Sequence, residues 1–189
     1  MSAEKFAASR NLFDALTAEL AAAATGGLTH GELEQVCEQR GREVLRQLLQ
    51  DHLDLRAFRE EQAIATGRIH RRVEKGHRRL LATVFGTVIV TRCALRHPGR
   101  LNRYPADAAL ALPAGRHSAG LVRLAVAESV RGSFDTAHAA ITQRCGKVIG
   151  KRQIEDRVVA AAADIDAFYT TRTLLPRTRE DLLILSFDG

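Results

Sequence analysis

The sequence contains no tryptophan, few aromatic residues of any kind and no long apolar run. Aromatic residues make up 5% of the 189 residues, so a hydrophobic core must be built from Leu, Val, Ile and Ala. No stretch approaches the roughly 20 apolar residues that a membrane helix needs, and the N-terminal segment lacks the apolar centre of a signal peptide. The sequence therefore predicts a cytoplasmic protein with no membrane partner.

Cysteine is also scarce, and Cys37, Cys93 and Cys145 are far apart in the sequence. None of them belongs to a Cys-x-x-Cys or Cys/His pair with the spacing of a zinc site. They are odd in number and are predicted to be ordinary reduced thiols, which argues against a disulfide scaffold.

Charge is distributed unevenly along the chain, which has a net charge of +6 and a pI near 9.8. Residues 63–103 hold 10 basic side chains and 1 acidic one, a net of +9, whereas residues 1–62 hold 7 basic and 11 acidic ones, a net of −4. Such a concentrated excess of Arg and Lys indicates a polyanionic partner, with a solvated basic face as the alternative.

Residues 1–62 are predicted to form a helical hairpin. The first helix, over residues 3–24, has apolar residues at helical spacing: Phe6, Phe13, Leu16 and Leu20. Thr29 and Glu32 form a capping box at the start of the second helix, which runs to about Glu61. Its predicted buried face consists of Leu33, Val36, Cys37, Val44, Leu45, Leu48, Leu49 and Leu53. An intramolecular bundle and a dimer-forming surface both fit this pattern.

Residues 63–103 are predicted to form a basic arm followed by a β-hairpin. The arm, residues 68–79, lacks strong apolar periodicity and could lie along a DNA backbone or in a minor groove. Gly86 is predicted at the first central position of a type II′ turn between two strands. The candidate DNA-binding side chains here are Arg71, Arg72, Lys75, Arg78 and Arg79.

Residues 104–117 are predicted to be a linker because they hold two of the 4 prolines. Residues 118–172 have the pattern of a helix-turn-helix region. Its first helix is predicted to start at Ser118, Ser133 is predicted to cap the second helix, and a third helix runs from Lys151 to about Thr170.

The DNA-binding hypothesis for this region depends on basic side chains around the loop between the second and third helices. The start of a helix carries free N–H groups and a partial positive charge, which suit a DNA phosphate. Gln153 and Arg157 could reach base edges. A plain helical hairpin with a basic loop is the alternative. The candidate DNA-binding residues are Arg144, Lys147, Lys151, Arg152, Gln153 and Arg157.

Residues 173–189 contain the apolar run 182–185, followed closely by Asp188. Such a run predicts a buried strand. An acid at the end of a strand suits metal-dependent phosphodiester chemistry, which needs rigidly held carboxylates. A strand that ends in Asp-Gly is also a common hairpin signal. Asp188 is therefore a candidate catalytic and metal-binding residue, with a turn residue as the alternative.

Several stretches, in chain order, resemble the N-terminal half of Kra-type insertion-sequence transposases, which are relatives of the bacterial Mutator-like DDE enzymes. These stretches are GLTHGELEQ (27–35), LLQDHLDLR (48–56), ATVFGTVIVTR (82–92), PADAALALPAG (105–115), RGSFDTA (131–137), GKRQIED (150–156) and LLILSFDG (182–189). The resemblance implies a helical N-terminal region, a β-hairpin, a DNA-binding helical region and the start of an RNase H-like catalytic domain. It implies the DNA of transposon ends as the partner.

The same resemblance implies that Asp188 matches the first acid of the DDE triad, which holds Mg²⁺ in the family. The second Asp and the Glu of that triad would lie beyond Gly189. The resemblance therefore leads us to expect that this chain is a transposase truncated within its catalytic domain. Such a chain is expected to bind no metal ion and to have no nuclease or strand-transfer activity alone.

Together these features predict a mainly α-helical fold with a β-hairpin and a helix-turn-helix-like region, ending in the first strand of an RNase H-like domain. The predicted function is DNA binding by a truncated transposase on the bacterial nucleoid. One alternative is a stand-alone helix-turn-helix regulator. Another is an inhibitor that forms mixed oligomers with an intact transposase, and a homo-oligomer is also compatible.

Overall fold

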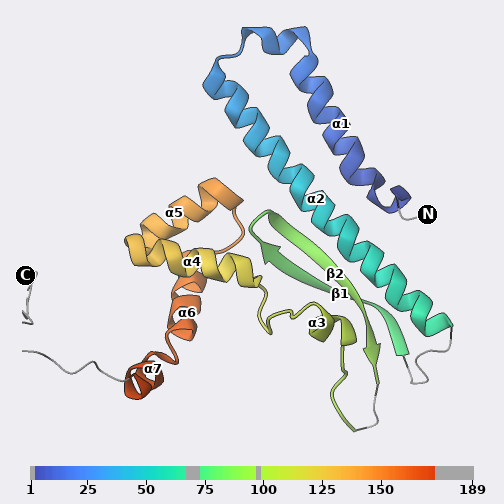
Figure 1. Cartoon of the computed structure of the whole chain (residues 1–189), viewed down its shortest axis with the longest axis vertical. Helices are drawn as coiled ribbons and strands as arrows, with labels where there is room; N and C mark the ends of the chain where they lie inside the picture. Colours follow the sequence, from blue (N-terminus) through green and yellow to red (C-terminus); the bar gives the residue numbers. More distant parts are fainter. Residues whose placement is uncertain (1–2, 67–72, 97–98, 173–189) are drawn as a thin grey trace, which may run out of the picture.

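The computed structural model describes residues 3–66, 73–96 and 99–172. Within these residues the chain is mainly helical with one two-stranded antiparallel sheet, as the sequence predicts (Figure 1). No helix in the described ranges is both long enough and apolar enough to cross a membrane.

An antiparallel pair of helices forms the N-terminal part of the fold. Its elements are a short 3-10 helix over Ala3–Phe6, α1 over Ala7–Ala21, a second 3-10 helix over Ala23–Gly27 and the long α2 over His30–Ala65. The predicted capping box is confirmed at the start of α2, where the Thr29 backbone N–H donates to Glu32 Oε2 at 2.7 Å and the Glu32 N–H donates to Thr29 Oγ1 at 3.4 Å.

A buried carboxylate fastens α1 to α2. Asp51 accepts a hydrogen bond from the Ser9 backbone N–H at 3.0 Å and another from the Gln47 side-chain amide at 2.7 Å. Ser9 lies in the first turn of α1, whose N–H groups have no partner within the helix. Both Ser9 and Asp51 are buried, so α1 is held to α2 by polar contacts as well as by apolar packing.

The predicted buried face of α2 is only partly confirmed. Leu53 is buried, whereas Leu45 is 47% exposed, Leu48 is 39% exposed and Cys37 is exposed. The periodicity correctly identifies the apolar stripe, but two helices alone cannot enclose a stripe of this width. Near Leu53 the β-hairpin packs closely on α2, whereas around Leu45 an open cleft separates α2 from the hairpin turn and α4.

That further layer is the β-hairpin, formed by β1 (Val73–Thr83) and β2 (Gly86–Leu95). The predicted turn position is wrong: Val84 and Phe85 are the central residues, and Thr83 pairs with Gly86. The Thr83 hydroxyl fixes this turn, because it donates to the Gly86 carbonyl at 2.7 Å and accepts from the Phe85 N–H at 3.2 Å. Part of the predicted basic arm, from Val73 onward, lies in β1.

Side chains of α2 close the outer edge of β2. The Gln50 amide accepts from the Ile89 N–H at 2.8 Å and donates to the Ile89 carbonyl at 3.0 Å. Glu60 accepts from the Cys93 N–H at 3.0 Å. An apolar cluster lies between the helix and the hairpin and consists of Leu53, Leu81, Val88 and Val90.

Replacing Gln50 by alanine should destabilise the fold by about 2 kcal/mol, because both backbone groups of Ile89 lose their partner in a partly buried position. Urea unfolding measures this difference. Gln39 lies exposed on the same helix, and Gln39→Ala is the matched control, with an expected change within about 0.5 kcal/mol. Equal stability of the Q50A variant and the wild type would show that α2 does not support the edge of β2 in this way.

Residues 104–117, predicted to be a linker, contain the short helix α3 (Pro105–Ala109) and pack on the hairpin. The Arg79 guanidinium donates to the carbonyls of Pro113 and Gly115 and lies 3.6 Å from Asp107. Arg92 also pairs with Asp107. This segment therefore follows a fixed path across the hairpin.

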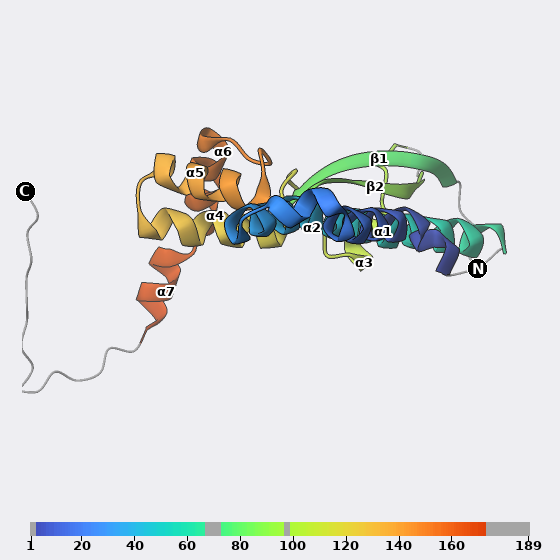
Figure 2. The ribbon, with the colours of Figure 1, turned by 90° about the horizontal axis from the view of Figure 1, so that it is seen from above.

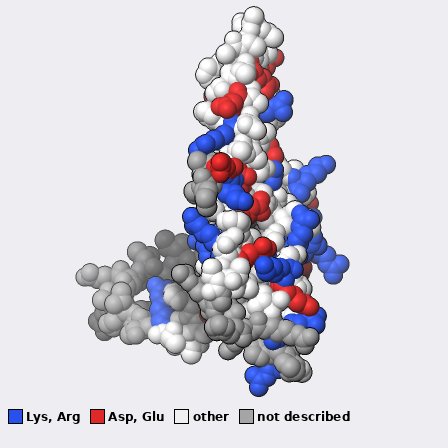
Figure 3. All heavy atoms as spheres, turned by 90° about the vertical axis from the view of Figure 1, so that its right-hand side faces the viewer, with Lys and Arg blue, Asp and Glu red and all other residues white. Residues whose placement is uncertain are grey.

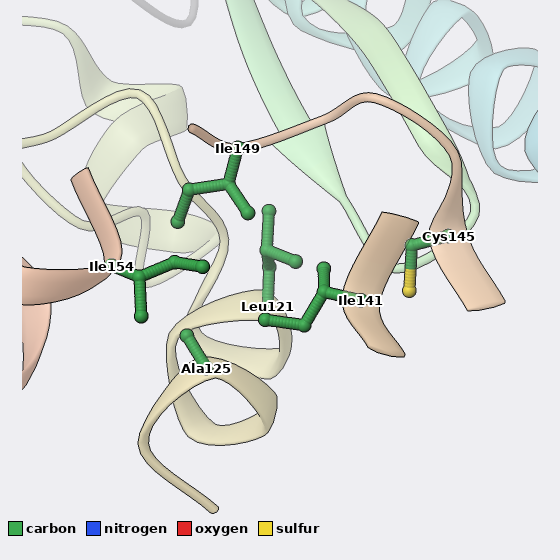
Figure 4. Close-up of a cluster of buried hydrophobic side chains, with 6 residues drawn as sticks. All are labelled: Leu121, Ala125, Ile141, Cys145, Ile149 and Ile154. Carbon is green, nitrogen blue, oxygen red and sulfur yellow. The ribbon is translucent and has the colours of Figure 1, made fainter. Parts of the chain in front are cut away.

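Three helices form a second packed unit: α4 (Ala119–Arg131), α5 (Phe134–Cys145) and α6 (Lys151–Ala161). The predicted cap at Ser133 is confirmed, because its hydroxyl accepts from the Thr136 N–H at 3.2 Å, and Ser118, the predicted start of the first helix, likewise accepts from the Leu121 N–H at 3.2 Å. The core of this unit is drawn in Figure 4, where side chains from all three helices and the loop before α6 point toward one another. It consists of Leu121, Ala125, Ile141, Cys145, Ile149 and Ile154.

The third predicted helix is not continuous to Thr170. It ends at Ala161, and a separate helix, α7, covers Ile165–Thr171. Residues 159–172 are exposed throughout, so no tertiary packing supports one long helix there. Figure 2 shows how the parts are layered: β1, α5 and α6 lie on one side of the layer that contains α1, α2 and α4.

Candidate nucleic-acid interface

The turn between α5 and α6 is held from within by a buried side chain. Gly146 ends α5 with φ +78°, a left-handed conformation that glycine adopts without strain. Ile149 is 5% exposed and packs into the core of the unit. The first turn of α6 is therefore fixed relative to α5, while Lys147 and Gly150 remain exposed.

The first turn of α6 is capped only in part. Its N-cap residue, Gly150, has no side chain to accept a hydrogen bond, so only the reverse contact forms, from the Gly150 N–H to Gln153 Oε1 at 3.0 Å. By contrast, serine side chains cap α4 and α5. The first N–H groups of α6 thus keep their partial positive charge without a capping side chain.

Several of the candidate basic residues lie within or next to this turn in the chain, although Arg144 lines the cleft between α2, α4 and the hairpin turn. Arg144, Lys147 and Arg152 are exposed, and within the described residues they form no ion pair. Lys151 donates from Nζ to Asp135 at 2.7 Å, and this hydrogen bond raises the pKa of Lys151. The three side chains without an acidic partner can therefore meet an external anion.

Gln153 and Arg157, which were predicted to reach bases, lie on the side of α6 that faces the segment before α4. The Gln153 side chain is occupied by the Gly150 N–H and by a contact with His117. Arg157 is half-buried, its guanidinium lies close to Gly115, and its Nε has no hydrogen-bond partner among the described residues. Their neighbours indicate that both side chains help to join α6 to the hairpin.

His117 lies at the centre of that junction and was not singled out from the sequence. The chain pairs with the edge of β1 here: the Ala82 N–H donates to the Arg116 carbonyl and the Ser118 N–H donates to the Ala82 carbonyl, both at 2.8 Å. Burial lowers the pKa of His117, as do the charges of Arg157 and Arg116, while the hydrogen bond with Gln153 raises it. A lowered pKa favours the neutral imidazole in the folded chain.

The burial of His117 predicts that the fold loses stability in acid. Because its folded-state pKa lies below the ordinary value of about 6.5, the unfolded chain takes up the proton first as the pH falls. This contribution to stability is complete above about pH 6.5 and is lost as the pH falls from there toward the folded-state pKa.

Urea unfolding at neutral pH and at about pH 5 measures this effect in the wild type and in His117→Gln. The wild type should lose more stability between the two conditions than the variant does. His52 is exposed on α2, and His52→Gln should keep the pH dependence of the wild type. An unchanged pH dependence in H117Q would contradict the assignment.

The candidate basic residues of the hairpin have separate surroundings. Lys75 and Arg78 are exposed on β1, without an ion pair among the described residues. Arg79, in contrast, is 15% exposed and binds the carbonyls of the 113–115 segment. Arg71 and Arg72 lie outside the described residues, so Lys75 and Arg78 are the candidates from this region whose charge faces solvent.

Asp188, the candidate catalytic and metal-binding residue, also lies outside the described residues. Across the ranges that the structure describes, no group of three or more His, Cys, Asp or Glu side chains could hold a metal ion.

Charged side chains of both signs lie on the surface. Figure 3 shows the right-hand side of the molecule as drawn in Figure 1, where both signs are mixed and Lys and Arg side chains are most frequent toward the right-hand edge of the view. On α6, Asp156 is exposed one turn beyond Arg152. The most favourable position for an anion is therefore the N-terminal end of α6 rather than its middle.

Two further basic residues near this surface were missed from the sequence. Arg116 is exposed just before α4, and Arg123 is exposed on α4 beside the cleft that α2, α4 and the hairpin turn enclose, a cavity of about 740 Å³. Arg116 lies two residues before the cap residue Ser118, which is a signal that the sequence does contain. No protein-family model matches this chain, and no curated protein or solved structure gives a significant match to it.

Proposed function

We propose that this chain binds double-stranded DNA through the N-terminal end of α6, with the hairpin strand β1 as a second contact. The observation that carries the proposal is the position of Lys147 and Arg152. These two exposed cations flank, in the sequence, a helix start that has no capping side chain, in a turn fixed by buried Ile149, and Arg144 is exposed in the last turn of α5 before it.

The chemistry of the turn suits a phosphate group. Backbone N–H groups at a helix start donate hydrogen bonds to phosphate oxygens, and the helix dipole adds to the attraction. Lys147 and Arg152 flank those N–H groups and can neutralise adjacent phosphates. Their positions are set by packed helices rather than by a free loop, so the contacts need little ordering when DNA binds.

The second contact follows from the layering of the fold. Lys75 and Arg78 lie on β1, on the same side of the molecule as α5 and α6. A duplex held at α6 can therefore extend toward β1 and meet both cations. Asp156 would repel a backbone laid along the middle of α6, which favours an approach by the N-terminal end of that helix.

The resemblance to Kra-type transposases gives this proposal a biological setting, which is recognition of transposon ends on the bacterial nucleoid. A stand-alone helix-turn-helix regulator is the alternative function that the same surface would serve. Competition between cognate transposon-end DNA and unrelated DNA separates them, since a transposase part should prefer the end sequence. Asp188 and Mg²⁺ have no part in the proposed binding.

Fluorescence anisotropy with a labelled duplex tests the proposal. The chain should bind the duplex, and the affinity should fall steeply between about 50 and 200 mM salt, because each neutralised phosphate releases a counterion. Binding that is absent at about 50 mM salt, or that does not change with salt, would overturn the proposal.

A further inference from the structure

A small cavity of about 160 Å³ lies between the hairpin and the start of α6. Its lining comes from both strands of the hairpin, from Arg116 and His117 before α4, and from Gln153 in the first turn of α6. A single water molecule needs about 10–15 Å³ of such space, so the cavity has room for a tetrahedral anion. Parts of the chain that are distant in the sequence therefore enclose one small site.

The surroundings of this cavity are basic. Arg116 is exposed and Arg157 is half-buried, and neither forms an ion pair within the described residues. Both guanidinium charges lower the pKa of His117, so both act on the same imidazole. No acidic side chain lines the cavity, and the hairpin contributes only uncharged residues to it: Leu80, Ala82 and Thr87. The described lining thus offers three basic groups nearby and no carboxylate to balance them.

The position of Arg157 is unfavourable unless an anion balances its charge. Its guanidinium lies close to Gly115, and its Nε is buried without a hydrogen-bond partner among the described residues. A buried polar or charged group costs free energy unless a partner compensates it, and the nearby charge of Arg116 adds repulsion. An anion that binds among these groups removes both penalties and therefore stabilises the folded chain.

His117 gives the site a fixed side. It is only 9% exposed, and the backbone on each side of it pairs with Ala82, which holds it against the edge of β1. Its imidazole forms a hydrogen bond with Gln153, whose Oε1 also accepts from the Gly150 N–H at 3.0 Å. The imidazole is therefore placed before any ligand arrives, so binding requires little ordering.

We propose that this cavity binds a phosphate group, held by Arg116, His117 and Arg157. The group belongs either to the DNA backbone or to a free phosphate ion, since both present the same tetrahedral set of oxygens. A backbone phosphate can reach the cavity because it lies between β1 and the start of α6, the two elements of the proposed DNA surface. The site does not depend on that DNA contact, because a free anion can fill it.

A sulfate titration of the full chain, followed by NMR, tests the site without DNA. Sulfate has the shape of phosphate, and its charge does not change near neutral pH. Chloride keeps the ionic strength constant. Sulfate should bind at millimolar concentration and shift the imidazole signal of His117, which the spectrum of His117→Gln identifies. It should also raise the pKa of His117 toward the ordinary value, because a bound anion stabilises the imidazolium.

Arg116→Gln should weaken sulfate binding about tenfold or more, because it removes a charge-assisted hydrogen bond. Arg116 is exposed, so the variant should keep the fold. Arg100 is exposed between β2 and α3 and has no ion pair among the described residues, and Arg100→Gln is the matched control. The control should bind sulfate as the wild type does. An imidazole signal of His117 that sulfate does not move, or an R116Q variant that binds sulfate as tightly as the wild type, would overturn the proposal.

Duplex binding by the same variant identifies the source of the phosphate. If the cavity holds a backbone phosphate, Arg116→Gln should weaken duplex binding and lower the slope of log affinity against log salt by about 0.9. If it holds a free ion, the variant should lose sulfate binding and keep its duplex affinity. A chain that binds sulfate but no duplex would contradict the DNA proposal alone, so the two proposals can fail separately.

Discussion

Replacing Lys147 and Arg152 together by alanine should weaken duplex binding by roughly ten- to a hundredfold. Both side chains are exposed beside the uncapped start of α6 and have no acidic partner among the described residues, so their removal leaves the fold intact. The slope of log affinity against log salt should fall by about 1.8, because each phosphate contact contributes about 0.9. Fluorescence anisotropy across a salt series measures both quantities.

The matched control replaces two cations on the other side of the molecule. Arg59 is exposed on α2, and Arg131 is 73% exposed at the end of α4. The double variant Arg59→Ala, Arg131→Ala removes the same net charge, so it should change the affinity only slightly. If both double variants lose affinity equally, binding depends on net charge alone and the surface at α6 has no special role.

Replacing Leu121 by alanine should cost about 3–4 kcal/mol of the free energy of unfolding. Leu121 is fully buried and joins α4 to the loop and helices that carry the proposed DNA surface. Truncation leaves a cavity that three packed and connected helices cannot easily close. A loss of this size is a large share of the stability of a single domain, which is typically about 5–15 kcal/mol.

Urea unfolding gives the measurement, and Leu101→Ala is its control. Leu101 is 92% exposed, so its truncation should change stability by no more than about 0.5 kcal/mol. Under conditions where L121A remains folded, its DNA affinity should match that of the wild type, because Leu121 faces no solvent. A cost below about 1 kcal/mol for L121A would mean that α4 does not anchor the unit.

The helix starts could be predicted from the sequence because capping is local. Thr29 with Glu32, Ser118 and Ser133 each satisfy N–H groups within a few residues of themselves, so the signal lies in a short stretch. Core residues of the three-helix unit could also be predicted from the sequence, because Leu121 and Ile154 fall on regular helical spacing.

The features that sequence reasoning missed depend on distant partners. The hairpin turn was misplaced because a Thr83 hydroxyl fixes it, in competition with the preference of Gly86 for another turn position. Part of the arm joins a strand because residues 90–95 pair with it. Arg79 was assigned to DNA, but its position opposite Pro113 arises only when the chain returns across the hairpin.

At the candidate DNA surface, the sequence identified the residue types but not their partners. Lys151 and Gln153 are occupied by Asp135 and Gly150 in the folded chain. The contact between Lys151 and Asp135 depends on the packing of α5 against α6, which helical periodicity does not predict, whereas the contact between Gln153 and Gly150 is local to the start of α6. Lys147 and Arg152 keep exposed charges at the surface of that packed unit.

The closing of the hairpin edges also determines how this chain avoids aggregation. A sheet of two strands has no interior strand, so each strand could recruit a strand of another molecule. Here Gln50 and Glu60 occupy the edge of β2, and the backbone at 116–118 occupies the edge of β1 at Ala82. The remainder of the β1 edge carries exposed Lys75 and Arg78, whose charges repel an identical strand. Protection of the β2 edge is therefore supplied by a helix outside the sheet, and at Gln50 and Glu60 it lasts only as long as α2 stays docked.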